Sequence, residues 1–571
     1  MNQQLSPVSD LNPVLVRLFK KRGLKPTDVE AMLSWNLKDI PTLTDMIDLP
    51  KASERLIRAI ENGERIGVYG DYDVDGTTSC ALLWHFFVMT GIEIEVFQPS
   101  RFVEGYGVHP SSIDAAIEKG VKVLITVDCG ISNTATADYA NEKGVDLIIT
   151  DHHRDAAPHI PRAYAVVNPN RRDEKDSELK TLAGVGVAFA LALQIKNDLA
   201  LKGKEIPTLY PLLQFVAIGT ISDLARMSPV NLRLTRHGLK QIPTSQYPGV
   251  RQFFSPEELK GMTVSSERIS FHVGPHINSK GRLDHPERAM KLLIAGNASE
   301  SLEHFTHLEV ANRDRRVIQA EVFAQAKKEV ISGLSGSELL INIVYQPQWH
   351  EGVIGIVASK LVETFEVPAV VFTDAEEEGV IKASARTAGE LNLFDLLESC
   401  KDLFIKFGGH KAAAGLSMKK ENFPAFKERM LNHLKTIPAP LRTKTQSYDI
   451  EVGIEEINAH LVKDLDKLEP WGPGHEKPVF RMKNAVIQSY KIMKDAHVRW
   501  TFMGTGSGNK KVMLQGISFN YLGKWNESTP DELFQMQEKS GLTIQFTLGV
   551  NKFNGNETIQ LMVDRVIPGT V

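Results

Sequence analysis

The fold of this chain is predicted most directly by Val145-Asp146-Leu147-Ile148-Ile149-Thr150-Asp151-His152-His153, an apolar run that ends in a carboxylate and two imidazoles. A short run rich in β-branched side chains is typical of a buried strand. The groups that follow are oxygen and nitrogen ligands of the kind that divalent metal ions bind. The stretch therefore predicts a strand that presents metal ligands at its carboxyl end.

Two upstream segments repeat this arrangement. Residues 66–69 run into Gly70-Asp71-Tyr72-Asp73-Val74-Asp75-Gly76, and residues 121–127 run into Asp128. Alternation of strands with helices long enough for crossovers predicts a parallel, doubly wound sheet, in which ligands bind beyond the carboxyl ends of the strands. All three acidic clusters fall at that edge. The intervening elements are expected at 77–89 (helix), 92–97 (strand), 111–118 (helix) and 132–143 (helix).

A fourth contributor is expected from residues 212–223, an apolar run that also ends in a carboxylate, Asp223. We interpret it as a further acidic strand end of the same sheet. Asp73 and Asp75 alternate with Val74, so an extended strand exit would point both carboxylates in the same direction. They could then reach two different ions.

Each of these residues also has an ordinary interpretation. An aspartate after a strand is more often a helix cap than a ligand, and Asp151 could cap the segment that follows it. Adjacent histidines such as His152 and His153 are usually surface residues. Four acidic strand ends in one predicted sheet nevertheless favour a shared site.

Composition places the chain among soluble globular proteins. It has 571 residues, 42% of them hydrophobic and 24% charged, so several domains are expected. The net charge of -4 excludes attraction to nucleic acid by total charge, and such binding would need a local basic surface. Three widely spaced cysteines do not indicate a disulfide framework, and no apolar window reaches the roughly 20 residues of a spanning helix. We expect a cytoplasmic protein without membrane contact.

The chain divides into five predicted parts. A helical lead-in precedes the parallel-sheet domain, a charged helical connector follows it, and a second, smaller α/β domain comes next. The last part begins as a proline-containing linker and continues as short strands, which predict a small β-barrel. Basic and aromatic residues interleave there, as in single-strand binding surfaces, but Trp500 and Phe502 could equally fill the barrel interior. The expected boundaries are 1–60, 61–285, 286–335, 336–436 and 437–571.

The acidic and histidine clusters together resemble the four motifs of the DHH phosphoesterase superfamily, named for its Asp-His-His signature. Other stretches resemble its single-strand-specific exonuclease branch, the RecJ family, and the likeness covers nearly the whole chain. It implies a DHH catalytic domain, a DHH-associated domain and an OB-like barrel. The stretches that carry the second resemblance are 101–107, 278–282, 349–358, 408–415 and 470–474.

The resemblance implies two divalent cations, Mn²⁺ or Mg²⁺, and a catalytic set. His153 would lie near the scissile phosphate, and Asp71 is a further candidate ligand. Small members of the superfamily that hydrolyse pyrophosphate carry a histidine where this chain has Tyr69, which favours the exonuclease branch. The implied metal ligands are Asp73, Asp75, Asp128, His152 and Asp223, with Asp128 as the bridge between the ions.

A pocket for the DNA end is expected in the second α/β domain. Ser384 and Arg386 would share one face of a strand, and Gly408-Gly409-His410 would form a glycine-rich turn whose amides approach a phosphate. A glycine pair is more often only a loop, and Arg386 could simply pair with a carboxylate. The resemblance adds Arg101 to the pocket, Tyr106 as a base-stacking residue, and Asn278 and Arg282 as contacts to the DNA backbone.

The function expected from these features is hydrolysis of single-stranded DNA from its 5′ end in DNA repair and recombination. The resemblance implies single-strand-binding protein and a RecQ-type helicase as partners, and we expect a monomer. One alternative is a phosphoesterase for short oligonucleotides or cyclic dinucleotides, which would not need a β-rich tail. Another is an inactive DNA-binding scaffold, which would gain nothing from clustered, mutually repelling carboxylates.

Overall fold

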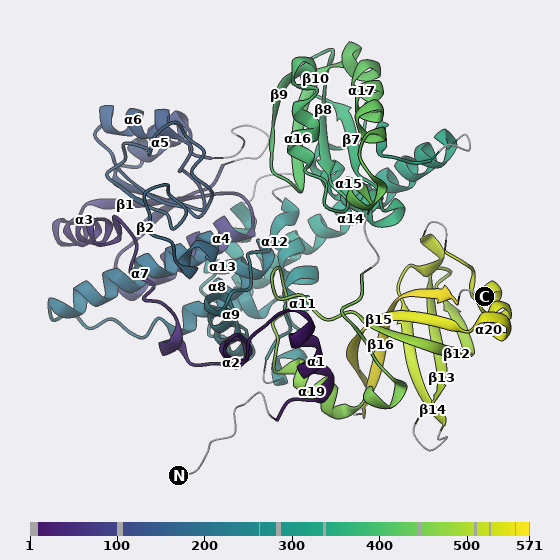
Figure 1. Cartoon of the computed structure of the whole chain (residues 1–571). Coiled ribbons are helices and arrows are strands. Elements are labelled where there is room, and N and C mark those ends of the chain that lie inside the picture. Colours follow the sequence, from purple (N-terminus) through teal and green to yellow (C-terminus); the bar gives the residue numbers. More distant parts are fainter. Residues whose placement is uncertain are drawn as a thin grey trace, which may run out of the picture. The chain divides into compact units, whose positions relative to one another are not determined.

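The computed structural model describes residues 10–99, 105, 107–261, 263–280, 287–334, 338–443, 447–506, 511–524, 527–553 and 556–569. Two compact units account for them. One consists of Pro26–Arg313 together with Asp466–Lys477, and the other holds the remaining described residues. Figure 1 shows the elements of each unit.

The first unit contains a parallel sheet with the strand order β2-β1-β3-β4-β5, which confirms the predicted doubly wound fold. Helices α5 and α6 pack on one face of the sheet, and α3, α4 and α7 pack on the other (Figure 1). The carboxyl ends of the central strands therefore meet at one edge. The strands are β1 (Arg65–Gly70), β2 (Ile94–Phe97), β3 (Val121–Val127), β4 (Asp146–Thr150) and β5 (Ala165–Val167).

The helices around this sheet bury a large apolar core. Among the described residues, α7 is long and apolar enough to cross a membrane, but more than half of it is buried in this core. The helices are α2 (Pro26–Leu33), α3 (Leu49–Asn62), α4 (Val74–Met89), α5 (Pro110–Glu118), α6 (Thr134–Glu142), α7 (Gly184–Leu201), α8 (Leu213–Ser222), α9 (Pro229–Gln241), α10 (Pro248–Arg251), α11 (Ser266–Arg268), a π-helix (Ile269–Val273), α12 (Gly274–Lys280) and α13 (Glu287–Ile294).

The run that ends in Asp223 forms a helix, α8, and the expectation of a strand there was wrong. An apolar run of this length fits a buried strand or a buried helix equally well by periodicity. Nearly every residue of α8 is buried, so the helix has no polar face that could have revealed its period.

A distant segment, Asp466–Lys477, belongs to this unit through a buried guanidinium. Arg236 on α9 donates hydrogen bonds to the carbonyl oxygens of Lys467, Leu468 and Glu469, and also to those of Met32 and Ser34. One side chain thereby satisfies carbonyls from two segments that are more than 400 residues apart in sequence.

The long helix α14 (Ala298–Gly333) leads into the second α/β domain, whose mixed sheet has the order β6-β7-β8-β10-β9. Helix α15 packs on one face of this sheet, and α16 and α17 pack on the other. The elements are β6 (Asn342–Tyr345), α15 (Glu351–Phe365), β7 (Ala369–Asp374), β8 (Val380–Arg386), α16 (Leu393–Glu398), β9 (Phe404–Gly409), β10 (Ala413–Lys419), α17 (Phe423–Lys435) and α18 (Ala439–Arg442).

The tail forms the predicted β-barrel, which closes because β12 pairs with both β13 and β15. Trp500 and Phe502 are fully buried, so they fill the barrel interior and are not available to stack on bases. The remaining elements of this unit are α1 (Pro13–Lys21), β11 (Ile450–Glu451), α19 (Ala459–Asp466), β12 (Phe480–Met493), β13 (His497–Thr505), β14 (Lys511–Ser518), α20 (Pro530–Ser540), β15 (Leu542–Phe553) and β16 (Asn556–Pro568).

Candidate metal centre

The predicted carboxylates after β1 lie on a helix start and not on an extended strand exit. Helix α4 begins at Val74, three residues earlier than expected, so Asp73 is its N-cap and accepts a hydrogen bond from the Gly76 amide. Asp75 lies in the first turn of the helix. In this position Asp73 can therefore both cap α4 and act as a metal ligand.

Asp75 is fully buried and is held by a second helix. Its two carboxylate oxygens accept hydrogen bonds from the Gly184 amide at 2.6 Å and the Val185 amide at 2.9 Å, in the first turn of α7. A Cβ at Gly184 would lie 2.8 Å from the Cβ of Asp128, so only glycine allows this approach. Gly184 was not among the residues predicted from the sequence. A glycine at the start of an apolar helix, next to predicted anionic groups, is the signal that could have found it.

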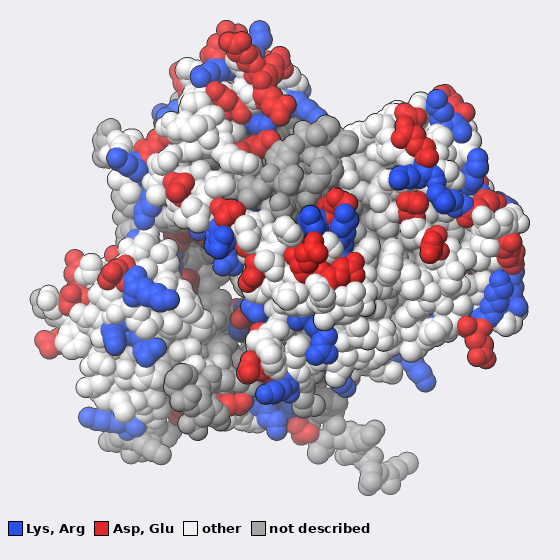
Figure 2. Space-filling model, turned by 180° about the vertical axis from the view of Figure 1, so that it is seen from behind, with Lys and Arg blue, Asp and Glu red and all other residues white. Residues whose placement is uncertain are grey.

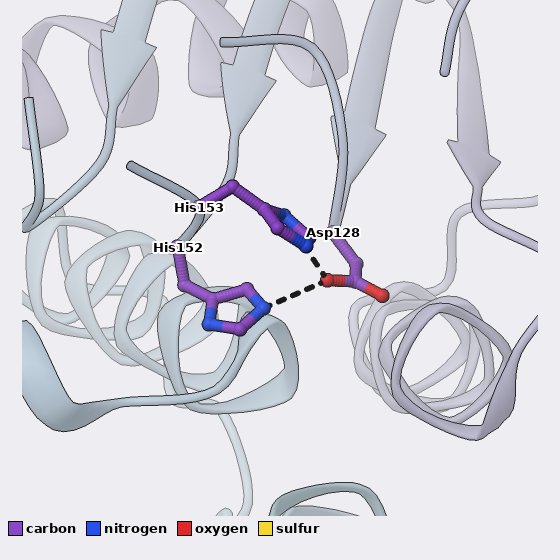
Figure 3. A group of neighbouring side chains, drawn as sticks. All are labelled: Asp128, His152 and His153. Carbon is purple, nitrogen blue, oxygen red and sulfur yellow. Dashed lines mark ion pairs between the residues drawn. The ribbon is translucent and has the colours of Figure 1, made fainter. Parts of the chain in front are cut away.

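Four side chains converge at the carboxyl edge of the sheet. His152 Nε2 lies 3.1 Å from an oxygen of Asp128, 3.7 Å from one of Asp75 and 3.8 Å from one of Asp223. Figure 3 shows His152 and His153 approaching the same carboxylate oxygen of Asp128 from the loop after β4. Residues that directly follow β3 and α8 and a residue from the loop after β4 thus meet Asp75 in the first turn of α4.

Among the described residues there are three groups of side chains whose possible ligand atoms all lie within 4.8 Å of one another inside each group. Asp128 belongs to two of the groups, and so does His152, which makes these residues the centre of the cluster. Asp71, which was expected only as a further candidate, joins one group. The groups are Asp128 with His152 and His153, Asp75 with His152 and Asp223, and Asp71 with Asp73 and Asp128.

The donor set fits a divalent cation. Burial, and then the neighbouring His153, lower the pKa of His152 to about 4, so its imidazole is neutral at pH 7. Its Nε2 is buried and accepts or donates no hydrogen bond within the part of the chain that the structure describes. A buried imidazole nitrogen beside three carboxylates is suited to coordinate a hard metal ion such as Mn²⁺ or Mg²⁺.

The carboxylates repel one another when no metal is bound. Burial, and then the charges of Asp223 and Asp73, raise the pKa of Asp75 well above its ordinary value. Burial and the surrounding aspartates raise the pKa of Asp128 in the same way. Burial and Asp73 raise the pKa of Asp223 to about 7. A cation would relieve this repulsion.

Asp151, the first residue of the signature, positions the histidines. One of its oxygens accepts hydrogen bonds from the backbone amides of His152 and His153 and lies 2.8 Å from His153 Nδ1. The other accepts from the Ile131 amide. The ordinary interpretation, in which Asp151 caps the segment that follows it, agrees with the bonds from the His152 and His153 amides. Burial opposes charge on His153, but the hydrogen bond and the charge of Asp151 outweigh it and raise the pKa of His153 to about 9.

Tyr69 stands where the resemblance implies a histidine in small, pyrophosphate-hydrolysing members of the superfamily. It is buried, and its hydroxyl donates a hydrogen bond to the carbonyl oxygen of Gly107. The side chain therefore has a structural hydrogen bond at this position.

The residues expected to hold the DNA end share one region of the second sheet. Ser384 on β8 is paired through Gly415 with Gly408 on β9, so the three lie in one row across the strands. The Arg386 guanidinium donates a hydrogen bond to the Ser384 hydroxyl. Gly408 and Gly409 are the last residues of β9 and not part of the turn, which was expected to include them and begins at His410.

Of the other predicted substrate residues, Asn278 is half-buried on α12 in the first unit. Arg101, Tyr106 and Arg282 lie outside the described residues.

Comparisons with known proteins give one consistent family. Models described as "DHH family, N-terminal domain", "DHHA1 domain" and "RecJ OB domain" match residues 65–220, 336–436 and 448–565. The single-stranded-DNA-specific exonuclease RecJ of Salmonella typhimurium is 32% identical over 584 residues, which cover 98% of this chain and 96% of that protein.

Solved structures agree with the sequence matches. RecJ from Thermus thermophilus in complex with Mn²⁺ has a TM-score of 0.79 at 24% identity and covers 100% of this chain and 78% of that one, which shows a shared fold. A crystal structure of exonuclease RecJ bound to manganese is 31% identical, with a TM-score of 0.58, over 70% of this chain and 97% of that one. With its parallel sheet, its mixed sheet, its barrel and this acidic edge, the chain belongs to the RecJ family of the DHH phosphoesterases.

Proposed function

We propose that this protein is an exonuclease that hydrolyses single-stranded DNA from its 5′ end with two divalent cations, Mn²⁺ or Mg²⁺. The observation that carries the proposal is the overlap of the candidate ligand groups at Asp128 and His152. Overlapping groups favour two neighbouring ions with a shared carboxylate, the arrangement that suits phosphoryl transfer. The proposed ligands are Asp73, Asp75, Asp128, His152 and Asp223, with Asp71 as a further ligand.

The bound ions would activate a water molecule and stabilise the charge that develops on the scissile phosphate. The protein supplies the geometry. Amides of α7 fix Asp75, and the neutral imidazole of His152 offers a nitrogen lone pair. His153, kept cationic by Asp151, is suited to bind a phosphate oxygen.

Recognition of the 5′ end is proposed for the second sheet. Arg386 and Ser384 offer a guanidinium and a hydroxyl that are already hydrogen-bonded to each other. Gly408 and Gly409 lie on the edge strand β9, which β10 separates from β8, and His410 follows directly after β9. A planar guanidinium can bind a terminal phosphate with two hydrogen bonds. We also propose Arg101, Tyr106, Asn278 and Arg282 as contacts to the DNA.

Local basic groups would have to bind the DNA backbone. On the face shown in Figure 2, Lys and Arg are interspersed with Asp and Glu, in agreement with the net charge of -4. On the barrel, exposed Lys491 and Arg499 lie directly opposite each other on β12 and β13. Like charges in such a pair destabilise a sheet, and a phosphate between them would remove the penalty.

Family membership supports the finer proposals. We propose single-strand-binding protein and a RecQ-type helicase as partners, the cytoplasm as location, and a role in DNA repair and recombination for the monomer. The predicted boundaries at 61–285, 286–335, 336–436 and 437–571 remain our proposed domain limits.

The test is digestion of oligonucleotides labelled at the 5′ or the 3′ end, with Mn²⁺, Mg²⁺ or a chelator. We expect a 5′ label to be released first as a mononucleotide, little hydrolysis of a blunt duplex, and no hydrolysis with chelator. Asp128→Ala should lower turnover at least a hundredfold while single-strand binding stays within about threefold. Release of the 3′ label first would refute the polarity, and faster turnover of dinucleotides than of long strands would favour the short-substrate alternative.

A further inference from the structure

Leu224 directly follows Asp223 and combines two features that are unfavourable for a leucine. Its φ is +57°, in the left-handed region, where a Cβ crowds the following carbonyl. Its side chain is also 65% exposed, so little packing within the protein compensates for this conformation. Residues held in rare backbone conformations cluster at functional sites.

The backbone of Leu224 closes the end of α8. Its amide donates to the carbonyl oxygen of Ile221, and the Ala225 amide donates to that of Thr220. These two bonds form the helix ending in which the left-handed position is usually a glycine. The hydrogen bonds therefore explain the conformation, but they do not explain a leucine, because glycine would adopt it without strain.

Both neighbouring segments hold this turn in place. On one side, a Cβ at Gly274 would lie 2.9 Å from the Ser222 hydroxyl, so helix α12 packs closely against the residue before Asp223. On the other side, the Met227 amide donates to the carbonyl oxygen of Pro473 at 2.7 Å. Leu224 is thus an exposed apolar side chain on a fixed turn, and its neighbour Asp223 reaches to 3.8 Å from His152.

We propose that Leu224 is a substrate-contacting residue that packs against the nucleotide whose phosphate lies at the metal centre. This inference rests on the proposed function. The groups identified at the centre are charged or polar and suit a phosphate, whereas a nucleotide also has apolar surface on its base and on its deoxyribose. An aliphatic side chain contacts these surfaces without preferring one base, as an exonuclease that degrades any sequence requires.

The experiment compares Leu224→Gly and Leu224→Ala with wild type in the full-length protein with Mn²⁺. Thermal unfolding and kcat/KM on a 5′-phosphorylated single strand are measured together. Leu224→Gly should unfold about 2–4 °C higher, because the strain at the helix end is relieved. Its kcat/KM should nevertheless fall about tenfold, mainly through KM, because the apolar contact is lost. Leu224→Ala should show the same kinetic loss without the gain in melting temperature.

Leu201→Ala is the matched control. Leu201 is an 88% exposed leucine at the carboxyl end of α7, whereas the amino end of that helix binds Asp75. The kcat/KM of Leu201→Ala should stay within twofold of the wild-type value. The Mn²⁺ concentration for half-maximal activity should be unchanged in both Leu224 variants. A substrate with an abasic nucleotide at its 5′ end shows whether Leu224 contacts the base or the deoxyribose. If Leu224 contacts the base, the difference in kcat/KM between wild type and the Leu224 variants disappears on this substrate. If it contacts the deoxyribose, the difference persists.

Three results would overturn the inference. Leu224→Gly could melt below wild type, which would give the leucine a structural role. Its kcat/KM could stay within twofold, or a higher Mn²⁺ requirement could account for the whole loss through Asp223. Wild-type protein that degrades no single-stranded DNA would instead refute the proposed function, a result distinguishable from these three.

Discussion

Substitution of Asp223 by asparagine should make the metal-free protein more stable at neutral pH and less responsive to Mn²⁺. Burial and the charge of Asp73 raise the pKa of Asp223 from 3.8 to about 7 in the folded protein. Between these pH values the folded protein holds a proton that the unfolded chain has lost. Stability therefore falls as the pH rises through this window.

The size of the effect follows from the shift. A difference of about 3 pKa units, at about 1.4 kcal/mol each, amounts to roughly 4 kcal/mol above pH 7. The Asp223 side chain is 24% exposed, so solvent screens only part of this energy. Asparagine keeps the shape but cannot ionise. At about 2–4 °C per kcal/mol, Asp223→Asn should melt on the order of 5–10 °C above wild type at pH 8 without metal.

The assay is calorimetric unfolding after chelation, from pH 4 to pH 8. The gain in melting temperature of Asp223→Asn over wild type should be largest at pH 8. It should vanish near pH 4, where the aspartate and the asparagine at position 223 are both neutral in the folded protein. Mn²⁺ at about 1,000 times its Kd should reverse the order, because it stabilises the wild-type protein by about 4.1 kcal/mol, which exceeds the solvent-screened part of the roughly 4 kcal/mol lost through ionisation. Asp176→Asn is the control, since the Asp176 side chain is 95% exposed in the same unit.

The reasoning fails if Asp223→Asn melts below wild type at pH 8 without metal. It also fails if the difference is the same at pH 4 and pH 8, because the gain would then not come from ionisation.

Three further outcomes are expected. Arg386→Ala should lower the ratio of kcat/KM on a 5′-phosphorylated end to kcat/KM on a 5′-hydroxyl end about tenfold, because a hydrogen bond to a charged group contributes about 1.5–3 kcal/mol. An unchanged ratio would show that Arg386 does not bind the 5′-phosphate. Burial lowers the pKa of His85 to about 4, so wild type should lose up to about 3 kcal/mol as the pH falls from 6.5 to 4. His85→Phe should flatten that part of the stability curve, and an equally steep curve would contradict this. Arg236→Met should destabilise the first unit by at least about 3 kcal/mol in urea unfolding, because it leaves buried carbonyl oxygens unsatisfied; a change below about 1 kcal/mol would show that water replaces the guanidinium.

The parallel sheet could be predicted because strands such as β3 and β4 are buried on both faces and read as continuous β-branched runs. Their carboxyl ends had to meet at one edge, so the convergence of Asp128 with His152 followed from topology alone. The place of these residues at the ends of neighbouring strands was therefore enough to predict that they lie close together, without any knowledge of their side-chain contacts.

Local conformation at the same site was harder to predict. Asp75 was expected on an extended segment, but α4 begins at Val74 because Asp73 caps it. Asp223 was expected on a strand, because α8 has no polar face to show a helical period. The hydrogen bonds from Gly184 and Val185 to Asp75 join residues 109 and 110 positions apart, and no local pattern encodes them.

The error at the start of α4 has a more general physical cause, since cap and ligand are not exclusive roles for a carboxylate. Asp73 caps α4, and Asp75 accepts amide hydrogen bonds at the start of α7, where the helix dipole favours negative charge. Asp151 accepts amides from its own loop. An amide that binds one lone pair of a carboxylate fixes the direction of the others, so the same bonds that end or begin a helix also aim the remaining oxygen lone pairs. Helix ends therefore lower the energy of a carboxylate cluster that would otherwise repel itself, and they hold it in position before any metal arrives.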